Sequence, residues 1–244
     1  MKNYKITIAY DGTPYQGWQK QGNTKNTLQE KFETILQEIS GQTVEIFGSG
    51  RTDAGTHATG QVANFHMDFS GTPEELREKI NQKLPETVAV RAIELVDDRF
   101  HARFHAKKKC YIYTIWNSNE PPVFLRKYSF TVKEPLDKKR MEQAAHSFIG
   151  THDFSSFSAN GKSKKSSVRT VESIDFSYDG EKIEIAFTGN GFLYQTVRIM
   201  VGTLIEIGEG KREDDILHCI EQKKRSVSGF TAPSKGLVLQ SVTY

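Results

Sequence analysis

The spacing of hydrophobic residues changes period several times along the first half of the chain. Residues 4–10 alternate apolar and polar side chains, as expected of a strand with one buried face. After Thr27, a residue type that caps helix N-termini, apolar residues recur at helical spacing up to residue 39. The same pattern predicts strands at 43–47, 61–65 and 87–95 and a second helix at 72–84. The resulting order, strand–helix–strand–strand–helix–strand, is the split βαβ arrangement of ferredoxin-like folds.

The second half follows the same outline. Asp179-Gly180 between two alternating runs is a strong hairpin signal. The elements expected after residue 106 are strands at 109–116, 128–132, 168–178, 182–188 and 237–244 and helices at 136–150, 191–207 and 213–224. We therefore predict an α+β fold of two ferredoxin-like modules, residues 1–105 and 106–244, with a central antiparallel sheet and a cleft. The segment 98–106 is the expected hinge between them.

The amino-acid composition indicates the class of protein and its expected location. The 244 residues are 36% hydrophobic and 26% charged, which is ordinary for a water-soluble protein. No apolar run approaches the roughly 18 residues of a membrane helix, and the N-terminus has no signal-peptide pattern. The two cysteines, Cys110 and Cys219, lie far apart in sequence, so we expect free thiols and a reducing, cytoplasmic location without membrane partners.

The net charge of +3 says little, but the basic residues are clustered. One cluster directly precedes the pair Tyr111 and Tyr113. Each cluster alone is typical of a solvated surface, whereas several together, one beside aromatic residues, favour a nucleic-acid partner. The candidate contacts to an RNA backbone are Lys107, Lys108, Lys109, Lys164, Lys165 and Arg169.

The candidate for chemistry is Asp53, at the centre of a glycine-rich stretch from residue 47 to residue 58. Glycines there indicate a tight turn that another backbone or a ligand approaches closely. Thr56 and His57 stand where a phosphate-binding loop needs Lys and Ser or Thr, which argues against nucleotide hydrolysis. The alternative is that Asp53 is a turn residue that bonds to its own backbone.

A metal site is not expected. Two histidines, His101 and His105, are four positions apart, as helix-borne metal ligands can be. No Glu-x-x-His pattern or cysteine pair accompanies them, so we predict that neither is a ligand.

Six blocks, in order and covering nearly the whole chain, resemble the tRNA pseudouridine synthase A family. The blocks are Tyr10-Asp11-Gly12-Thr13 with Tyr15, Gly17, Trp18, Gln19 and Gln21; Gly50 to Gly55 with His57 and Ala58; Phe100 to Phe104 followed by Tyr111 and Tyr113; His152-Asp153-Phe154 with Ser156 and Phe157; Asn190 and Phe192 with Val197-Arg198 and Val201-Gly202; and Gly236-Leu237 with Leu239, Val242 and Tyr244. The resemblance implies conversion of uridine to pseudouridine at positions 38, 39 and 40 of the tRNA anticodon stem-loop. It also implies base flipping, a homodimer, and no cofactor or metal.

The resemblance assigns roles to single residues. Asp53 would be the essential carboxylate, either as a nucleophile or as a base that removes the 2′-hydrogen of the ribose. Arg198 would keep that carboxylate ionised. Tyr111 would stack on the target uracil, while Tyr113 would be a core residue, and Arg51 would enter the base stack or hold a phosphate.

Two departures from the family pattern stand out. Thr56 replaces the usual valine of the loop, and Lys109 replaces an arginine that often precedes the stacking tyrosine. Two other functions are possible for a chain with these residues. A non-catalytic RNA-binding module would explain the basic and aromatic segments, but not Asp53, Arg51 and Arg198 together. A hydrolase that uses Asp53 and His57 would need a nucleophile or metal that the sequence does not suggest.

Overall fold

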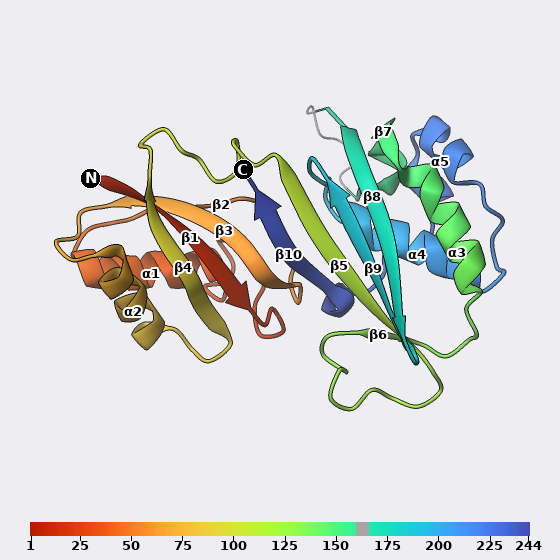
Figure 1. Cartoon of the computed structure of the whole chain (residues 1–244), viewed down its shortest axis with the longest axis horizontal. Helices are drawn as coiled ribbons and strands as arrows, with labels where there is room; N and C mark the ends of the chain where they lie inside the picture. The colour runs from red at the N-terminus through yellow and green to blue at the C-terminus, as the bar shows by residue number, and fades with distance from the viewer. Residues whose placement is uncertain (160–165) are drawn as a thin grey trace. The chain divides into compact units, whose positions relative to one another are not determined.

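A computed structural model describes residues 1–159 and 166–244 of the chain (Figure 1). The chain divides into two units, Met1–Lys107 with Val238–Tyr244, and Lys108–Leu237. Both units combine helices with mostly antiparallel strands, which confirms the predicted α+β class. Residues 238–244, which were expected in the second module, pack in the first unit.

The first unit is built on a sheet centred on β1 (Lys2–Tyr10). This strand pairs antiparallel with β3 (His57–Met67) on one side and with β4 (Val88–Val96) on the other. Alternate residues of β1 point into the core, where Tyr4, Ile6 and Ile8 are fully buried. The period-2 pattern of residues 4–10 therefore reflects one buried face.

Two helices cover this sheet, α1 (Leu28–Ser40) and α2 (Pro73–Lys83), and they lie side by side in Figure 1. The Thr27 hydroxyl accepts the Glu30 N–H at the start of α1, and Gly41 ends the helix with φ of 72°. Thr72 and Glu75 form a reciprocal capping box at the start of α2. Both helices thus begin within one residue of the sequence prediction, because their caps are local signals.

One edge of β3 is shared by two strands in succession. The short strand β2 (Ile46–Gly48) pairs antiparallel with residues 63–65 of β3. Further along the same strand, β10 (Leu237–Thr243) pairs in parallel, with Val238 opposite His57 and Leu239 opposite Ala58. Thr59 Oγ1 donates to Gln240 Oε1 at 2.9 Å, which ties the two strands together. The chain between Gly48 and His57 therefore loops out where the edge of β3 changes partner.

The strands of the second unit follow the order β5-β9-β8-β7. The strands β5 (Lys108–Asn117), β9 (Lys182–Gly189) and β8 (Val168–Asp179) are antiparallel neighbours. The predicted hairpin joins β8 to β9, with Gly180 at φ of 60°. A short strand, β6 (Phe130–Val132), runs parallel to the end of β5. The edge strand β7 (Gly150–Asp153) was not predicted, because its four residues carry no alternating hydrophobic pattern.

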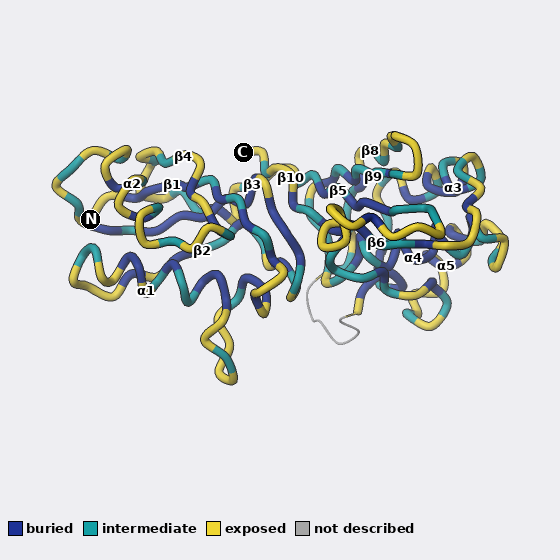
Figure 2. Tube along the Cα trace, turned by 90° about the horizontal axis from the view of Figure 1, so that it is seen from below, coloured by how far each residue is buried: buried dark blue, intermediate teal, exposed yellow. Residues whose placement is uncertain are grey.

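Three helices accompany this sheet: α3 (Lys138–Ala145), α4 (Thr196–Gly208) and α5 (Ile216–Gln222). The prediction that the α4 helix begins at Gly191 is wrong, because Gly191 and Gln195 have φ of 149° and 63° and break the helical path. Nearly every residue of α4 is buried, as the dark segment in Figure 2 shows. Within residues 1–159 and 166–244, no helix combines the length and the apolar composition needed to cross a bilayer.

Candidate active site

The loop that carries Asp53 is anchored at its start by a buried glutamine. Ser49 Oγ donates to Gln61 Oε1 at 2.7 Å, and Gln61 Nε2 donates to the Gly50 carbonyl at 3.0 Å. The Ser49 N–H bonds to the Val62 carbonyl at 2.7 Å. Gln61 is completely buried in β3, so these bonds are shielded from water and fix the direction in which the loop leaves β2.

A second set of bonds holds the residues on both sides of Asp53 to the segment that follows β1. The Thr52 carbonyl accepts the Trp18 N–H at 3.0 Å, and the Thr52 hydroxyl lies 2.8 Å from the Tyr10 hydroxyl. The Gly55 N–H donates to the Tyr15 carbonyl at 3.3 Å. Asp53 lies between these anchors and is half-buried. Its backbone position is therefore determined by the surrounding fold rather than by a freely moving turn.

Glycines allow these two segments to touch at the level of their backbones. A Cβ atom on Gly12 would lie 2.0 Å from the Thr56 carbonyl oxygen, and one on Gly17 would lie 2.7 Å from that of Thr52. Gly17 also has φ of 92°, a region that favours glycine. A Cβ on Gly48 would lie 2.5 Å from the Trp18 ring. Of the two explanations for the glycines, the close approach of another part of the chain thus accounts for these three.

His57, at the start of β3, supports the same contact. Its Nδ1 accepts the Gly12 N–H at 3.0 Å, and Asp11 Oδ1 lies 3.2 Å from the same nitrogen. The Asp11 carboxylate oxygen also accepts the Thr13 N–H at 2.9 Å. Because His57 is only 3% exposed and its Nδ1 is engaged with the backbone, the imidazole acts as a brace for the Gly12 turn. This observation argues against a hydrolase that uses Asp53 and His57.

The remaining candidate on this loop, Arg51, is exposed two residues before Asp53. The histidines of the segment 98–106 accept backbone N–H groups. His105 Nδ1 accepts the His101 N–H at 3.3 Å, and His101 Nδ1 accepts the Arg103 N–H at 3.1 Å.

The two tyrosines of β5 lie in the second unit and differ in their surroundings. Tyr113 is fully buried, and its hydroxyl donates to the Pro233 carbonyl at 2.8 Å. Burial raises the pKa of Tyr113 far above its usual value. Tyr111 is 9% exposed and meets the edge of Phe192 at 5.5 Å between ring centroids and an angle of 89°. Tyr113 is thus a core tyrosine, as predicted, while the stacking role of Tyr111 stays a prediction.

Arg198 lies in the first turn of α4 and is held by the segment before β10. Its Nε donates to the Ala232 carbonyl at 2.7 Å, and the Ala232 N–H returns a bond to the Arg198 carbonyl at 3.0 Å. A Cβ on Gly202 would lie 1.9 Å from the Phe230 carbonyl oxygen, so glycine permits this close backbone packing. Arg198 and Asp53 belong to different units, and an ion pair between them stays a prediction.

The basic residues predicted to contact the RNA backbone differ in their exposure and in their contacts. Lys107 is exposed in the first unit, whereas Lys108 forms an ion pair with Glu172 at 2.6 Å in the second. Lys109 is half-buried, and Arg169 Nη1 donates to the Ser166 carbonyl at 2.9 Å. Lys164 and Lys165 lie outside the described residues.

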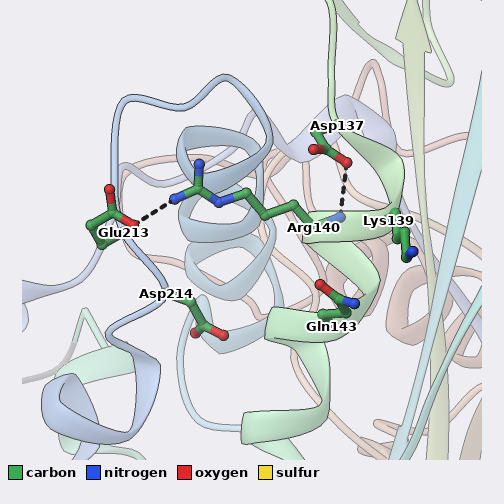
Figure 3. A pocket seen from close by; sticks show the side chains of 6 residues that line it. All are labelled: Asp137, Lys139, Arg140, Gln143, Glu213 and Asp214. Atoms are coloured by element: carbon green, nitrogen blue, oxygen red, sulfur yellow. Dashed lines mark hydrogen bonds and ion pairs between the residues drawn. The ribbon is translucent and has the colours of Figure 1, made fainter.

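A polar depression of about 540 Å³ lies elsewhere in the second unit (Figure 3). Its lining residues are Asp137, Lys139, Arg140, Gln143, Glu213 and Asp214. The Arg140 guanidinium pairs with Glu213 at 2.8 Å, and the Arg140 N–H donates to Asp137 at 2.9 Å. Neither Tyr111 nor Arg198 lines this depression, so it does not correspond to the predicted site.

Comparison with known proteins identifies the family. Residues 6–105 and 144–244 match a family described as tRNA pseudouridine synthase. The chain belongs to the tRNA pseudouridine synthase family. It is therefore an enzyme of the isomerase class, as predicted. The matched ranges of the family include Asp53, Arg51 and Arg198, whereas Tyr111 lies between them.

Several members of the tRNA pseudouridine synthase family align over their whole length. The chain is 46% identical over 245 residues to a tRNA pseudouridine synthase A from Bacillus sp. strain KSM-64, with 100% of each chain covered. It is 45% identical to a protein of the same name from Acetivibrio thermocellus and 42% identical to a tRNA pseudouridine synthase A 2 from Bacillus cereus, again with full coverage of both chains.

The loop that carries Asp53 is recognisable in the sequence, but the bonds that hold it are not. Gln61 reads in sequence as an ordinary polar strand residue, and its bonds to Ser49 and Gly50 depend on tertiary contact. The aromatic and amide residues after Tyr10 were visible as a signal, and the structure shows that Tyr15 and Trp18 fasten the loop.

Proposed function

We propose that this enzyme converts uridine to pseudouridine at positions 38, 39 and 40 of the tRNA anticodon stem-loop, with Asp53 as the essential carboxylate and without a cofactor. The observation that carries the proposal is the anchoring of the Asp53 loop. Asp53 is the only acid among residues 49–56, and backbone bonds from Trp18 and Gly55 hold the chain on either side of it. A carboxylate held in this way needs little rearrangement to meet a flipped nucleotide.

The reaction balances without an external reagent. The bond from ribose C1′ to uracil N1 breaks, the uracil turns, and C1′ bonds to C5. The proton displaced from C5 leaves, and N1 takes up a proton, so no electrons enter or leave overall. Asp53 acts in its ionised form, either by attack on the nucleotide or by removal of the 2′-hydrogen.

Arg198 and Tyr111 act together with Asp53 in the proposed reaction. Arg198 keeps Asp53 ionised, since an opposite charge nearby favours the carboxylate form. The bond from Arg198 Nε to the Ala232 carbonyl supports this role, because it orients the guanidinium group. Tyr111 stacks on the flipped uracil, and the edge-on contact with Phe192 supports that role by fixing the plane of its ring.

Binding of the tRNA uses Arg51 and the basic residues Lys107, Lys108 and Lys109. The extrusion of the uridine costs a few kcal/mol, and contacts from Arg51 and from Tyr111 offset this cost. The lysines contact phosphates, and the ammonium of Lys108 exchanges Glu172 for a phosphate when the tRNA binds. The enzyme works in the cytoplasm, where its tRNA substrate is found and where free thiols such as Cys110 and Cys219 persist.

The enzyme acts as a homodimer. An exposed apolar loop between β5 and β6 supports this part of the proposal, with Val123 59% and Phe124 92% exposed. Bonds within its unit hold the loop in shape, including Tyr128 N–H to the Leu125 carbonyl at 2.8 Å and Lys235 Nζ to the Arg126 carbonyl at 3.1 Å. An ordered apolar loop of this kind is typical of a protein–protein contact.

The test is to map pseudouridine in an unmodified tRNA transcript after incubation with the enzyme. Carbodiimide treatment makes reverse transcriptase stop at each pseudouridine. We expect stops at positions 38 to 40 with the wild type, and at least about 10²-fold slower formation with Asp53→Asn. The control Asp68→Asn, an exposed acid of the same unit, should act as the wild type.

Binding of the tRNA is measured in parallel by filter retention. Asp53→Asn should retain its affinity, which separates loss of chemistry from loss of binding. Product formation by Asp53→Asn at the wild-type rate would refute the role of the carboxylate. A wild-type protein that binds tRNA but forms no pseudouridine would instead favour the RNA-binding module.

A further inference from the structure

Three aromatic rings form a tilted stack at the end of β2 in the first unit, with each ring inclined by 42° to the next. Phe47 lies 5.1 Å from the His101 ring, and His101 lies 4.3 Å from the Phe104 ring, measured between centroids. Phe47 directly precedes Gly48, where the Asp53 loop begins. The last ring of the stack, Phe104, is 73% exposed.

The turn that carries His101 and Phe104 is held by several hydrogen bonds. Asn3 Nδ2 donates to the carbonyls of Asp97 and Phe100, each at 2.9 Å. The Ala102 N–H donates to Asn64 Oδ1 at 2.8 Å, and its carbonyl accepts the Tyr244 hydroxyl at 2.7 Å. Asn3 and Asn64 are each 1% exposed. Two buried polar side chains therefore fix the shape of this turn, while the Phe104 ring itself packs into no core.

The stack is uncharged, and a cation lies beside its outer ring. Burial is the main cause that lowers the pKa of His101, and its Nδ1 accepts a backbone N–H, so the ring is neutral at physiological pH. The Arg103 guanidinium lies 6.0 Å from the centre of the Phe104 ring. From Arg99 to Lys109 the chain holds five arginines and lysines and no acid. Flat rings beside cations match the chemistry of RNA, in which bases alternate with phosphates.

We propose that the exposed face of Phe104 is a stacking site for an unpaired base of the tRNA, with Arg103 on the neighbouring phosphate. The inference rests on the proposed function, because it takes tRNA as the bound molecule. This base is not the target uridine, whose partner is Tyr111. Phe104 continues the ring stack outward, so the base becomes its fourth ring. The site provides affinity and orientation and takes no part in the chemical step.

The test compares variants of Phe104 in the complete enzyme. Phe104→Ala should weaken tRNA binding about 5- to 100-fold, the range expected for one stacked base. Phe104→Trp keeps a flat ring and should bind as the wild type. The matched control is Phe69→Ala, which removes a half-buried ring that also has a cation over it, Lys79 at 5.3 Å, and should leave binding unchanged.

Two further measurements identify what the ring contacts. The rate of pseudouridine formation at saturating enzyme in a single turnover should be unchanged in Phe104→Ala, since the variant affects binding alone. A fully paired RNA duplex offers no free base, so its affinity should be the same for the wild type and for Phe104→Ala.

The outcomes are distinct. Equal tRNA binding by Phe104→Ala and the wild type would overturn the inference, as would equal weakening by Ala and Trp. Equal loss of affinity for duplex and tRNA would also overturn it, because the contact would then be to the backbone. Failure of the proposed function would appear differently, as a wild-type enzyme that forms no pseudouridine whatever residue 104 is.

Discussion

The hydroxyl of Thr56, three residues after Asp53, leads to a specific prediction about the free energy of unfolding. Thr56 is 2% exposed, and its Oγ1 has no hydrogen-bond partner in the described part of the chain. A buried hydroxyl without a partner costs about 1–3 kcal/mol relative to one that water can reach. Valine has nearly the same shape and branches at the same carbon, and it is the residue that the family pattern leads one to expect here.

We therefore expect Thr56→Val to raise the free energy of unfolding of the first unit by about 1 kcal/mol. For a protein of this size, that corresponds to an increase in melting temperature of roughly 2–4 °C. Activity should stay at the wild-type level, because the bond from the Thr56 N–H to the Asp53 carbonyl, at 3.1 Å, belongs to the backbone and is kept.

The assay is urea unfolding followed by tryptophan fluorescence. Trp18 is 2% exposed in the first unit, and Trp116 lies in the second, so Trp116→Phe in every protein leaves a probe for the first unit alone. The matched control is Thr52→Val on the same loop. The Thr52 hydroxyl lies 2.8 Å from that of buried Tyr10, so its removal should lower stability by about 1 kcal/mol. An unchanged or lower urea midpoint for Thr56→Val would refute the reasoning, and so would a rise for both variants.

Three other predictions concern separate regions. Gly17→Ala should reduce pseudouridine formation more than about 10-fold and lower the urea midpoint of the first unit, because a Cβ would lie 2.7 Å from the Thr52 carbonyl oxygen. Gly22→Ala is the control: its Cβ meets nothing within 4 Å, so both the activity and the urea midpoint should stay at the wild-type level. Burial alone would raise the pKa of Asp153, but bonds from Ser155, Ser167 and Lys223 outweigh it and lower the pKa to about 2. Asp153→Asn should thus cost about 1 kcal/mol at pH 7, and the difference from the wild type should vanish in unfolding titrations as the pH falls from about 4 to 2; a constant difference would count against it. Phe124→Ser should shift the enzyme from dimer to monomer in light scattering, while Leu217→Ser, at 54% exposure, should not; a dimeric Phe124→Ser would remove this loop from the interface.

Much of the fold could be predicted because its signals are local. The caps of α1 and α2 and the Asp179-Gly180 hairpin depend on residues within a few positions of each other. The start of α4 was predicted wrongly, because the apolar residues before Thr196 suit a partly exposed loop as well as a helix. The strand β7 was missed because an edge strand of four residues needs no hydrophobic face.

The candidate site was predictable in part. The motif around Asp53 and the resemblance over the whole chain pointed to the family, which the comparison confirmed. The supports of the loop were not predictable, since the bonds of Gln61 to Ser49 and Gly50 follow from the pairing of β2 with β3.

The sequence by itself determined most of the order of helices and strands, although not β7, together with the family and the loop that carries Asp53. Tertiary structure alone decided that β10 pairs with β3, that Gly12 and Gly17 receive the backbone of that loop, and that Phe104 is exposed at the end of a ring stack. The physical reason is the range of the interactions. A period or a cap depends on neighbours along the chain, whereas a contact such as that of Thr59 with Gln240 joins residues 181 positions apart.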